Sequence, residues 1–202
     1  WTRMLASGVA SLLLSGSMLA HSGVFTKTGV LWNVAPSPLG TAVVTGIASG
    51  NNVVVVVGES GLVKYSNDNG KTFNTATHSL GSYRFNGVSF CGGKYFIYNE
   101  NGGIAYSLNG QVFTSITNPH GVGFYKSFIT VAYGDGKFLF GGYVTAISTD
   151  GVSLTATLSG LGRIYSIQYG LSSFMIGTDV GVYKSTDGVS FTELNNPFGS
   201  SV

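Results

Sequence analysis

Charged side chains are scarce in this sequence. Asp, Glu, Lys and Arg make up 9% of its 202 residues, whereas a soluble domain usually has about 25%. Ten basic residues against eight acidic ones leave a formal charge of +2, too little for the basic surface that nucleic-acid binding needs. We therefore predict no nucleic-acid partner. A surface covered mainly by Ser, Thr, Asn and Gly is more typical of extracellular and virion proteins than of cytosolic enzymes, and we predict such a location.

Cysteine is almost absent. The single Cys91 excludes an internal disulfide and a cysteine-rich zinc site. It lies in the apolar stretch VSFCGG, which favours a buried small hydrophobe over a reactive thiol. His78 and His120 fall in different parts of the chain, and neither has a second ligand at metal-binding spacing. We therefore predict no metal site and no cofactor.

Helical periodicity and long apolar runs are also missing. No segment keeps the helical period for three turns. The stretch MLASGVASLLLSGSMLA could be the core of a signal peptide, with Arg3 before it. We instead assign it to two strands, because residues 5–8 align with the repeated residues 47–50. After that assignment, no run of about 18 apolar residues remains to span a membrane.

The sequence does contain many glycines, and some of them mark a repeat. Five apolar runs are each followed by a glycine, a short polar turn and a second apolar run. The glycines are Gly8, Gly50, Gly92, Gly134 and Gly170, with spacings of 42, 42, 42 and 36 residues. A second phrase follows each of them in step: TKTGVLW, SNDNGKTF, SLNGQVF, STDGVSL and STDGVSF. The chain therefore consists of five units of about 40 residues.

Each unit is predicted to form four short strands. In the fourth unit the strands would be 128–134, 137–142, 145–148 and 153–158, separated by turn residues. Four-stranded units with this period are typical of β-propellers, in which each sheet is one blade around a central axis. We predict an all-β fold, a single β-propeller domain over 1–202 with five four-stranded blades at roughly 1–35, 36–77, 78–118, 119–159 and 160–202.

The second phrase resembles the Asp-box, also called the BNR repeat, of sialidase-like propellers. Ser185, Asp187, Gly188 and Phe191 match it in full, and Thr28 replaces the aspartate in the first unit. The other units carry Asp68, Asn109 and Asp150 in that position. Asp and Asn can accept backbone N–H groups in the turn, while Gly takes the positive φ, and the aromatic residue can pack between blades. We predict that these acids hold turns and are not catalytic.

Function is predicted on one face of the propeller. Strand direction alternates, so the turns between second and third strands lie on the same face as the connections between units. We call this the loop face. Irregular loops on a rigid scaffold commonly bind ligands. The candidate ligand-binding residues for a sugar or a peptide are Glu59, Tyr83, Arg84, Glu100, Tyr125, Arg163 and Asp179. Phe124 and Tyr165 lie in the same loops. The alternative is a solvated loop surface without a ligand.

Three functions fit these observations. The preferred one is a non-enzymatic binding or structural propeller: a phage or other virion surface, tail or decoration protein, or a secreted module that docks to a protein partner or a glycan. Oligomers are compatible with it, and no catalytic residue is predicted. The second is a sialidase-like glycoside hydrolase, for which the resemblance implies an arginine triad. The three arginines, Arg3, Arg84 and Arg163, all fall at or just before first strands, but sialidases have six blades. The third is an assembly-factor scaffold, as some Asp-box propellers are in photosynthetic membranes.

Overall fold

The computed structural model describes residues 37–157 and 160–194, together with the backbone pairing of 26–27 and 30–31. The chain divides into two compact units, Trp1–Ser37 and Pro38–Val202. In the first unit β1 (Thr26–Lys27) pairs antiparallel with β2 (Val30–Leu31). The strands predicted around Gly8 and the turn at Thr28 lie outside the described residues.

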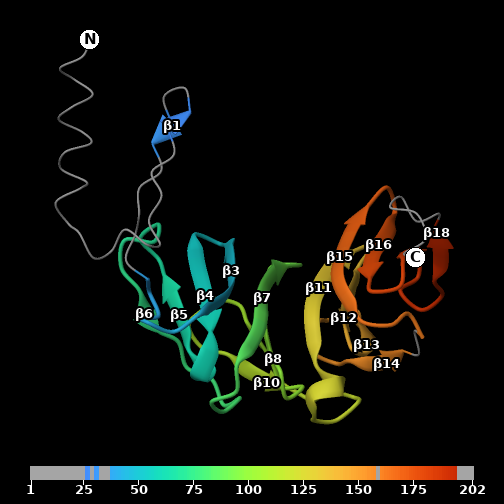
Figure 1. Cartoon of the computed structure of the whole chain (residues 1–202), viewed down its shortest axis with the longest axis horizontal. Helices are drawn as coiled ribbons and strands as arrows, with labels where there is room; N and C mark the ends of the chain where they lie inside the picture. The colour runs from blue at the N-terminus through green and yellow to red at the C-terminus, as the bar shows by residue number, and fades with distance from the viewer. Residues whose placement is uncertain (1–25, 28–29, 32–36, 158–159, 195–202) are drawn as a thin grey trace. The chain divides into compact units, whose positions relative to one another are not determined.

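The second unit contains four antiparallel sheets of four strands each, and every sheet follows chain order (Figure 1). The first sheet has β3 (Val44–Gly50), β4 (Val53–Gly58), β5 (Val63–Ser66) and β6 (Asn74–Thr75). The second has β7 (Phe85–Cys91), β8 (Lys94–Asn99), β9 (Ile104–Ser107) and β10 (Thr114–Ile116). The third has β11 (Phe128–Gly134), β12 (Lys137–Gly142), β13 (Thr145–Ser148) and β14 (Thr155–Thr157). The fourth has β15 (Ile164–Gly170), β16 (Ser173–Thr178), β17 (Val182–Ser185) and β18 (Thr192–Leu194).

Two short 3-10 turns, η1 (Glu59–Gly61) and η2 (Phe124–Lys126), interrupt the loops. No helix in the described residues is long and apolar enough to cross a membrane.

The first and second strands of every sheet are joined by a two-residue hairpin. Both central residues have positive φ in each case, which is the type I′ geometry that matches the twist of the strands. The pairs are Asn51 and Asn52, Gly92 and Gly93, Asp135 and Gly136, and Leu171 and Ser172. The pairing register also shifts near the start of the first strand of each sheet, which we call the innermost strand. Examples are the shift between Phe128 and Thr130 and the one between Ile164 and Ser166. The four sheets therefore repeat one local design.

The apolar cores lie between neighbouring sheets. The second strand of the second sheet shows why: Tyr95 and Ile97 face the first sheet, and the alternate residue Phe96 faces the third. A strand buried on both faces reads as a continuous apolar run, as KYFIYN does. The third core joins Leu139 of the third sheet to Phe174 of the fourth. The innermost strands β3, β7, β11 and β15 contact one another in that order.

Four of the five predicted blades lie in the described residues, and each of them is a four-stranded sheet. The predicted first blade, at 1–35, falls almost wholly outside the described residues, which show only the pair β1–β2 there. Within Trp1–Ser37 the described residues form the antiparallel pair β1–β2, in which Thr26 pairs with Leu31. In each of the four sheets a longer connection separates the third and fourth strands, such as the one from Ser66 to Asn74.

Strand bounds were predicted more closely. The strands expected at 128–134, 137–142 and 145–148 are confirmed as β11, β12 and β13, whereas 153–158 contains only the shorter β14. The predicted blade boundaries stay predictions.

Candidate functional site

The turns between third and fourth strands, here called the Ser-Asp turns, share one hydrogen-bond pattern. In the third sheet the Ser148 hydroxyl donates to Asp150 Oδ1 at 2.8 Å and accepts the Gly151 N–H at 2.8 Å. Asp150 Oδ1 also accepts the N–H groups of Val152 and Ser153, both at 2.7 Å. Equivalent bonds surround Asp68, Asn109 and Asp187. These side chains are occupied by the backbone of their own turns.

The same bonds explain the electrostatics of these turns. Donation from Thr72, Ser66 and Lys71 holds the pKa of Asp68 well below its usual range. Backbone N–H groups, aided by nearby hydroxyls, lower the pKa of Asp150 and Asp187 in the same direction. Hydrogen bonds to a carboxylate favour its charged form, so all three remain ionised at neutral pH.

The aromatic position after each Ser-Asp turn was expected to pack between blades. Phe113 of the second sheet is 4% exposed and belongs to the core shared with the first sheet. Leu154 packs against the core between the second and third sheets, and Phe191 against the one between the third and fourth. Full burial of a large side chain, as for Phe113, contributes about 1.5–3 kcal/mol, and the partly buried Leu154 and Phe191 contribute less.

At the loop face, the turn between second and third strands meets the start of the innermost strand. We call this meeting point the corner. In the second sheet the Glu100 N–H donates to the Arg84 carbonyl at 3.0 Å, and the Arg84 N–H donates to Glu100 Oε1 at 3.3 Å. In the fourth sheet Asp179 and Arg163 make the same two bonds, at 3.1 and 2.9 Å. Both predicted acids thus accept the backbone N–H of a predicted arginine.

The other two corners keep only the backbone bond. The Glu59 N–H donates to the Val43 carbonyl at 3.2 Å, and the Tyr143 N–H donates to the Ser127 carbonyl at 3.0 Å. Tyr143 therefore occupies the corner position that carries an acid in the other three sheets. Its role was missed in the sequence, where only the acids stood out. Aligning the four corners in register would have shown the exception.

Tyr143 is the centre of a partly exposed group that we call the aromatic–arginine cluster: Phe124, Tyr125, Tyr143, Arg163 and Tyr165. The ring centroids of Phe124, Tyr125 and Tyr143 lie 5.2–5.3 Å from one another. The Arg163 guanidinium carbon lies 4.7 Å from the centroid of the Tyr143 ring and 4.9 Å from that of Tyr165. Phe124, Tyr125 and Tyr165 are 51%, 74% and 52% exposed. An arginine held over aromatic rings and large exposed rings beside it make a surface suited to binding.

The structure brings some predicted residues together and leaves others apart. Tyr125 and Arg163 both contact the Tyr143 ring, and Asp179 accepts the backbone N–H of Arg163. Arg84 and Glu100 form a separate corner two sheets away, with exposed Tyr83 just before it. Glu59 belongs to the first sheet. The seven candidates therefore belong to three separate corners and the loops beside them, and their binding of one ligand stays a prediction.

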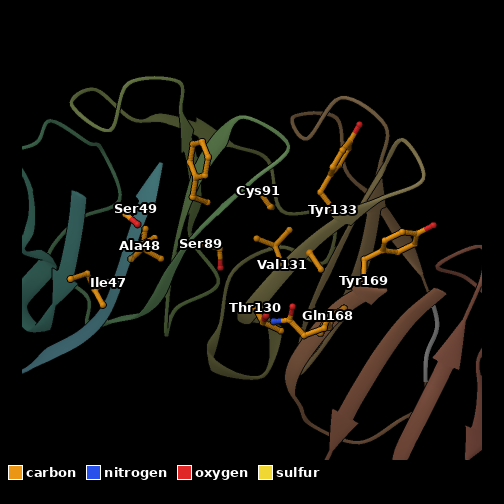
Figure 2. A pocket seen from close by; sticks show the side chains of 14 residues that line it. Ile47, Ala48, Ser49, Ser89, Cys91, Thr130, Val131, Tyr133, Gln168 and Tyr169 are labelled. Atoms are coloured by element: carbon orange, nitrogen blue, oxygen red, sulfur yellow. The ribbon is translucent and has the colours of Figure 1, made fainter. Parts of the chain in front are cut away.

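The innermost strands line a hollow of about 430 Å³, shown in Figure 2. Its lining includes Ser49, Ser89, Thr130 and Gln168, one from each sheet, with Tyr133 and Tyr169 at its edge. Cys91 also lines it, and burial raises the pKa of that thiol to about 12, as expected for an unreactive cysteine. The sequence alone did not single out this hollow, because it depends on the innermost strands standing side by side.

Metal ligands do not gather in the described part of the chain, where no group of three His, Cys, Asp or Glu side chains comes together. Each of the two described histidines meets a backbone carbonyl. His78 Nε2 lies 2.9 Å from the Gly61 oxygen, and His120 Nε2 lies 2.8 Å from the Thr145 oxygen.

No protein-family model and no curated protein matches the chain. Solved structures do. YCF48 bound to a D1 peptide has a TM-score of 0.57 and 20% identity, over 75% of this chain and 52% of that one. YCF48 from Cyanidioschyzon merolae has a TM-score of 0.54 and 18% identity, over 75% and 56%. The GH74 enzyme of Niastella koreensis has a TM-score of 0.53 and 23% identity, over 74% and 24%.

The chain thus spans a little over half the length of the YCF48 structures. A match to the WD40 propeller domain of Doa1, with a TM-score of 0.53, agrees with them. Together with the four chain-ordered sheets and the cores between them, these likenesses show that the chain has a β-propeller fold.

Proposed function

We propose that this chain is a non-enzymatic binding propeller that docks a polypeptide segment of a partner protein on its loop face. The observation that carries the proposal is the aromatic–arginine cluster, which presents three rings that are at least half exposed around one arginine. Tyr, Phe and Arg are the residues that protein interfaces enrich, and a few such anchors supply most of the binding energy.

Five of the acidic side chains already accept hydrogen bonds from the backbone, which supports a binding role over a hydrolytic one. Most glycosidases use a pair of carboxyl groups on either side of one bond, and sialidases use a tyrosine nucleophile with a carboxylic acid. Asp68, Asp150 and Asp187 are bonded within their turns, and Glu100 and Asp179 accept backbone N–H groups at their corners. For a sialidase-like triad, Arg84 and Arg163 would have to bind one carboxylate, whereas the Arg163 guanidinium lies over the rings of Tyr143 and Tyr165. Arg3 lies outside the described residues.

A structural neighbour adds support for a polypeptide ligand. One of the solved YCF48 structures is of that propeller bound to a D1 peptide. We carry over only the chemical class, since the likeness is one of fold and covers about half of that protein. This fits the assembly-scaffold alternative better than the phage or glycan alternatives.

Two finer points belong to the same proposal. The hydrogen bonds of the Ser-Asp turns support placing this chain among the Asp-box propellers. The low content of charged residues supports an extracellular or virion location.

The test is a binding survey of the full chain against an array of short peptides blocked at both ends, beside a glycan array and a fluorogenic sialoside. We expect peptides to bind, and binding to fall about tenfold or more in the double variant Phe124→Ser, Tyr125→Ser. The control is Leu171→Asn, at a fully exposed hairpin residue of the opposite face. Sialoside turnover, glycan binding without peptide binding, or equal loss in the control would contradict the proposal.

A further inference from the structure

The Arg163 guanidinium contacts two tyrosine rings but, among the described residues, no carboxylate. Its guanidinium carbon lies 4.7 and 4.9 Å from the centroids of two tyrosine rings. Its buried Nε–H has no hydrogen-bond partner in the part of the chain that the structure describes. The one ion pair found among the described side chains joins Lys137 to Asp135, so no carboxylate there pairs with Arg163. A guanidinium is always charged and carries five N–H donors in a planar fork.

The nearest acid does not neutralise it. Asp179 Oδ1 accepts the backbone N–H of Arg163, not the guanidinium. Lys126, the last residue of η2, adds an exposed cation next to Phe124 and Tyr125 in the chain. Arg163 and Lys126 against Asp179 leave a formal charge of +1 among these three residues, and arginine binds carboxylates in bidentate fashion.

Resting on the proposed function, we infer that Arg163 is the anchor for an acidic side chain of the partner's segment. The carboxylate of a partner Asp or Glu binds the guanidinium fork. A neighbouring apolar side chain of the same segment covers the rings of Phe124 and Tyr125. Stacking on tyrosine holds the guanidinium plane, so less freedom is lost when the carboxylate binds.

An acidic sugar is the other source of a carboxylate, and the cluster suits it less well. A sugar site needs several free polar groups placed around a stacking ring to fix the hydroxyls. Here the nearest carboxylate, Asp179, is bonded to a backbone N–H. The groups of the cluster that can contact a ligand are therefore mainly aromatic rings and one guanidinium, and residues of these types are the usual anchors of protein interfaces.

The fold supplies a matched control. Arg84 holds the same corner position in the second sheet, and its backbone makes the same pair of bonds with Glu100. No aromatic ring stacks on its guanidinium among the described residues, where the arginine–ring contacts found are both those of Arg163. Arg84 is exposed and keeps its charge without the tyrosine support. Changing the two arginines in the same way therefore separates the cluster from general charge.

The experiment uses the best-binding blocked peptide from the array and its copy with each Asp or Glu replaced by Asn or Gln. Both are titrated into the wild-type full chain and the variants Arg163→Gln, Arg163→Lys and Arg84→Gln, whose folding is checked by circular dichroism. We expect the acidic peptide to bind the wild type at least about tenfold more tightly than the amide copy. This preference should vanish in Arg163→Gln, weaken in Arg163→Lys and persist in Arg84→Gln.

The outcomes separate this inference from the function on which it rests. If peptides bind but the amide copies bind equally well, or Arg84→Gln removes the preference and Arg163→Gln does not, the anchor is wrong and the peptide-binding function stands. A parallel array carries the same peptides with an unblocked C-terminus; if only these bind, the source of the carboxylate is wrong. If no peptide binds, or acidic glycans bind in their place, both proposals fail.

Discussion

The Ser-Asp turns and the corners lie on the same four sheets, yet they differ in how closely the sheets resemble one another. All four Ser-Asp turns repeat one pattern, with a serine hydroxyl and a carboxylate or amide oxygen receiving the turn's N–H groups. The corners repeat only the backbone bond, and the third one replaces the acid by Tyr143. Repeated side chains therefore maintain the fold, while departures from the repeat make the loop face differ from sheet to sheet, and the proposed binding surface lies at one of them.

The largest difference in the free energy of unfolding is expected between a change at a buried core ring and one at an exposed side chain. Phe140 is fully buried between the second and third sheets, with its ring 5.3 Å from Phe96 and 5.7 Å from Phe128. Phe140→Ala should lower the free energy of unfolding by about 3–5 kcal/mol, because it leaves a cavity. Denaturant titration measures this, with Leu108→Ala, at a 63% exposed site, as the control. Equal effects of the two changes would contradict a core between the sheets.

A smaller loss is expected when a Ser-Asp turn loses its serine. Ser148 is 4% exposed, and its hydroxyl accepts the buried Gly151 N–H. Ser148→Ala should cost about 1–3 kcal/mol in the free energy of unfolding, because that donor is left without a partner. The neighbouring exposed Thr149→Ala gives the reference value in the same denaturant titration. A result within error of this reference would mean that the turn does not depend on the hydroxyl.

The acids of the turns should also make stability depend on pH. The folded pKa values of Asp68, Asp150 and Asp187 lie below the unfolded value of about 3.9. Their contribution is therefore fully present above that value and is lost as pH falls from about 4 toward the folded pKa values. Melting temperatures measured between neutral pH and strongly acidic pH should drop in this window. The triple variant D68N, D150N, D187N should show a flatter profile, and an unchanged profile would contradict the assignment.

The smallest effect on stability is expected at the cluster itself. Tyr125 is 74% exposed, so Tyr125→Ala should change the free energy of unfolding by less than about 0.5 kcal/mol. The same change should weaken binding of the array peptides, because it removes ring surface. A large loss of stability would instead place Tyr125 among the residues that maintain the fold.

Local signals in the sequence were sufficient to predict much of the fold. The bounds of β11, β12 and β13 follow from apolar runs broken by turn residues such as Asp135 and Gly136, which occupy the positive-φ hairpin. The Ser-Asp turns are also local, since Ser148 and Asp150 bond groups at most three residues away. Both features are encoded within a few residues, and the repeat shows them several times.

The site depends on contacts that the repeat does not encode. Arg163 meets Tyr143 of the preceding sheet, and Tyr143 meets Phe124 and Tyr125 across the third sheet's loops. The individual residues Tyr125 and Arg163 were named, but their meeting requires the packing of two sheets. The same holds for the hollow between the innermost strands. The four blades predicted over 36–202 correspond to the four sheets, whereas the predicted blade at 1–35 lies almost wholly outside the described residues.

The placement of the cores between sheets has a kinetic consequence. In the described residues, the second and third sheets each share in two apolar cores, whereas the fourth shares in one. Amide protons of β8 and β12 should therefore exchange with deuterated solvent only when two cores open, while those of β17 and β18 should exchange earlier, because their sheet takes part in one described core.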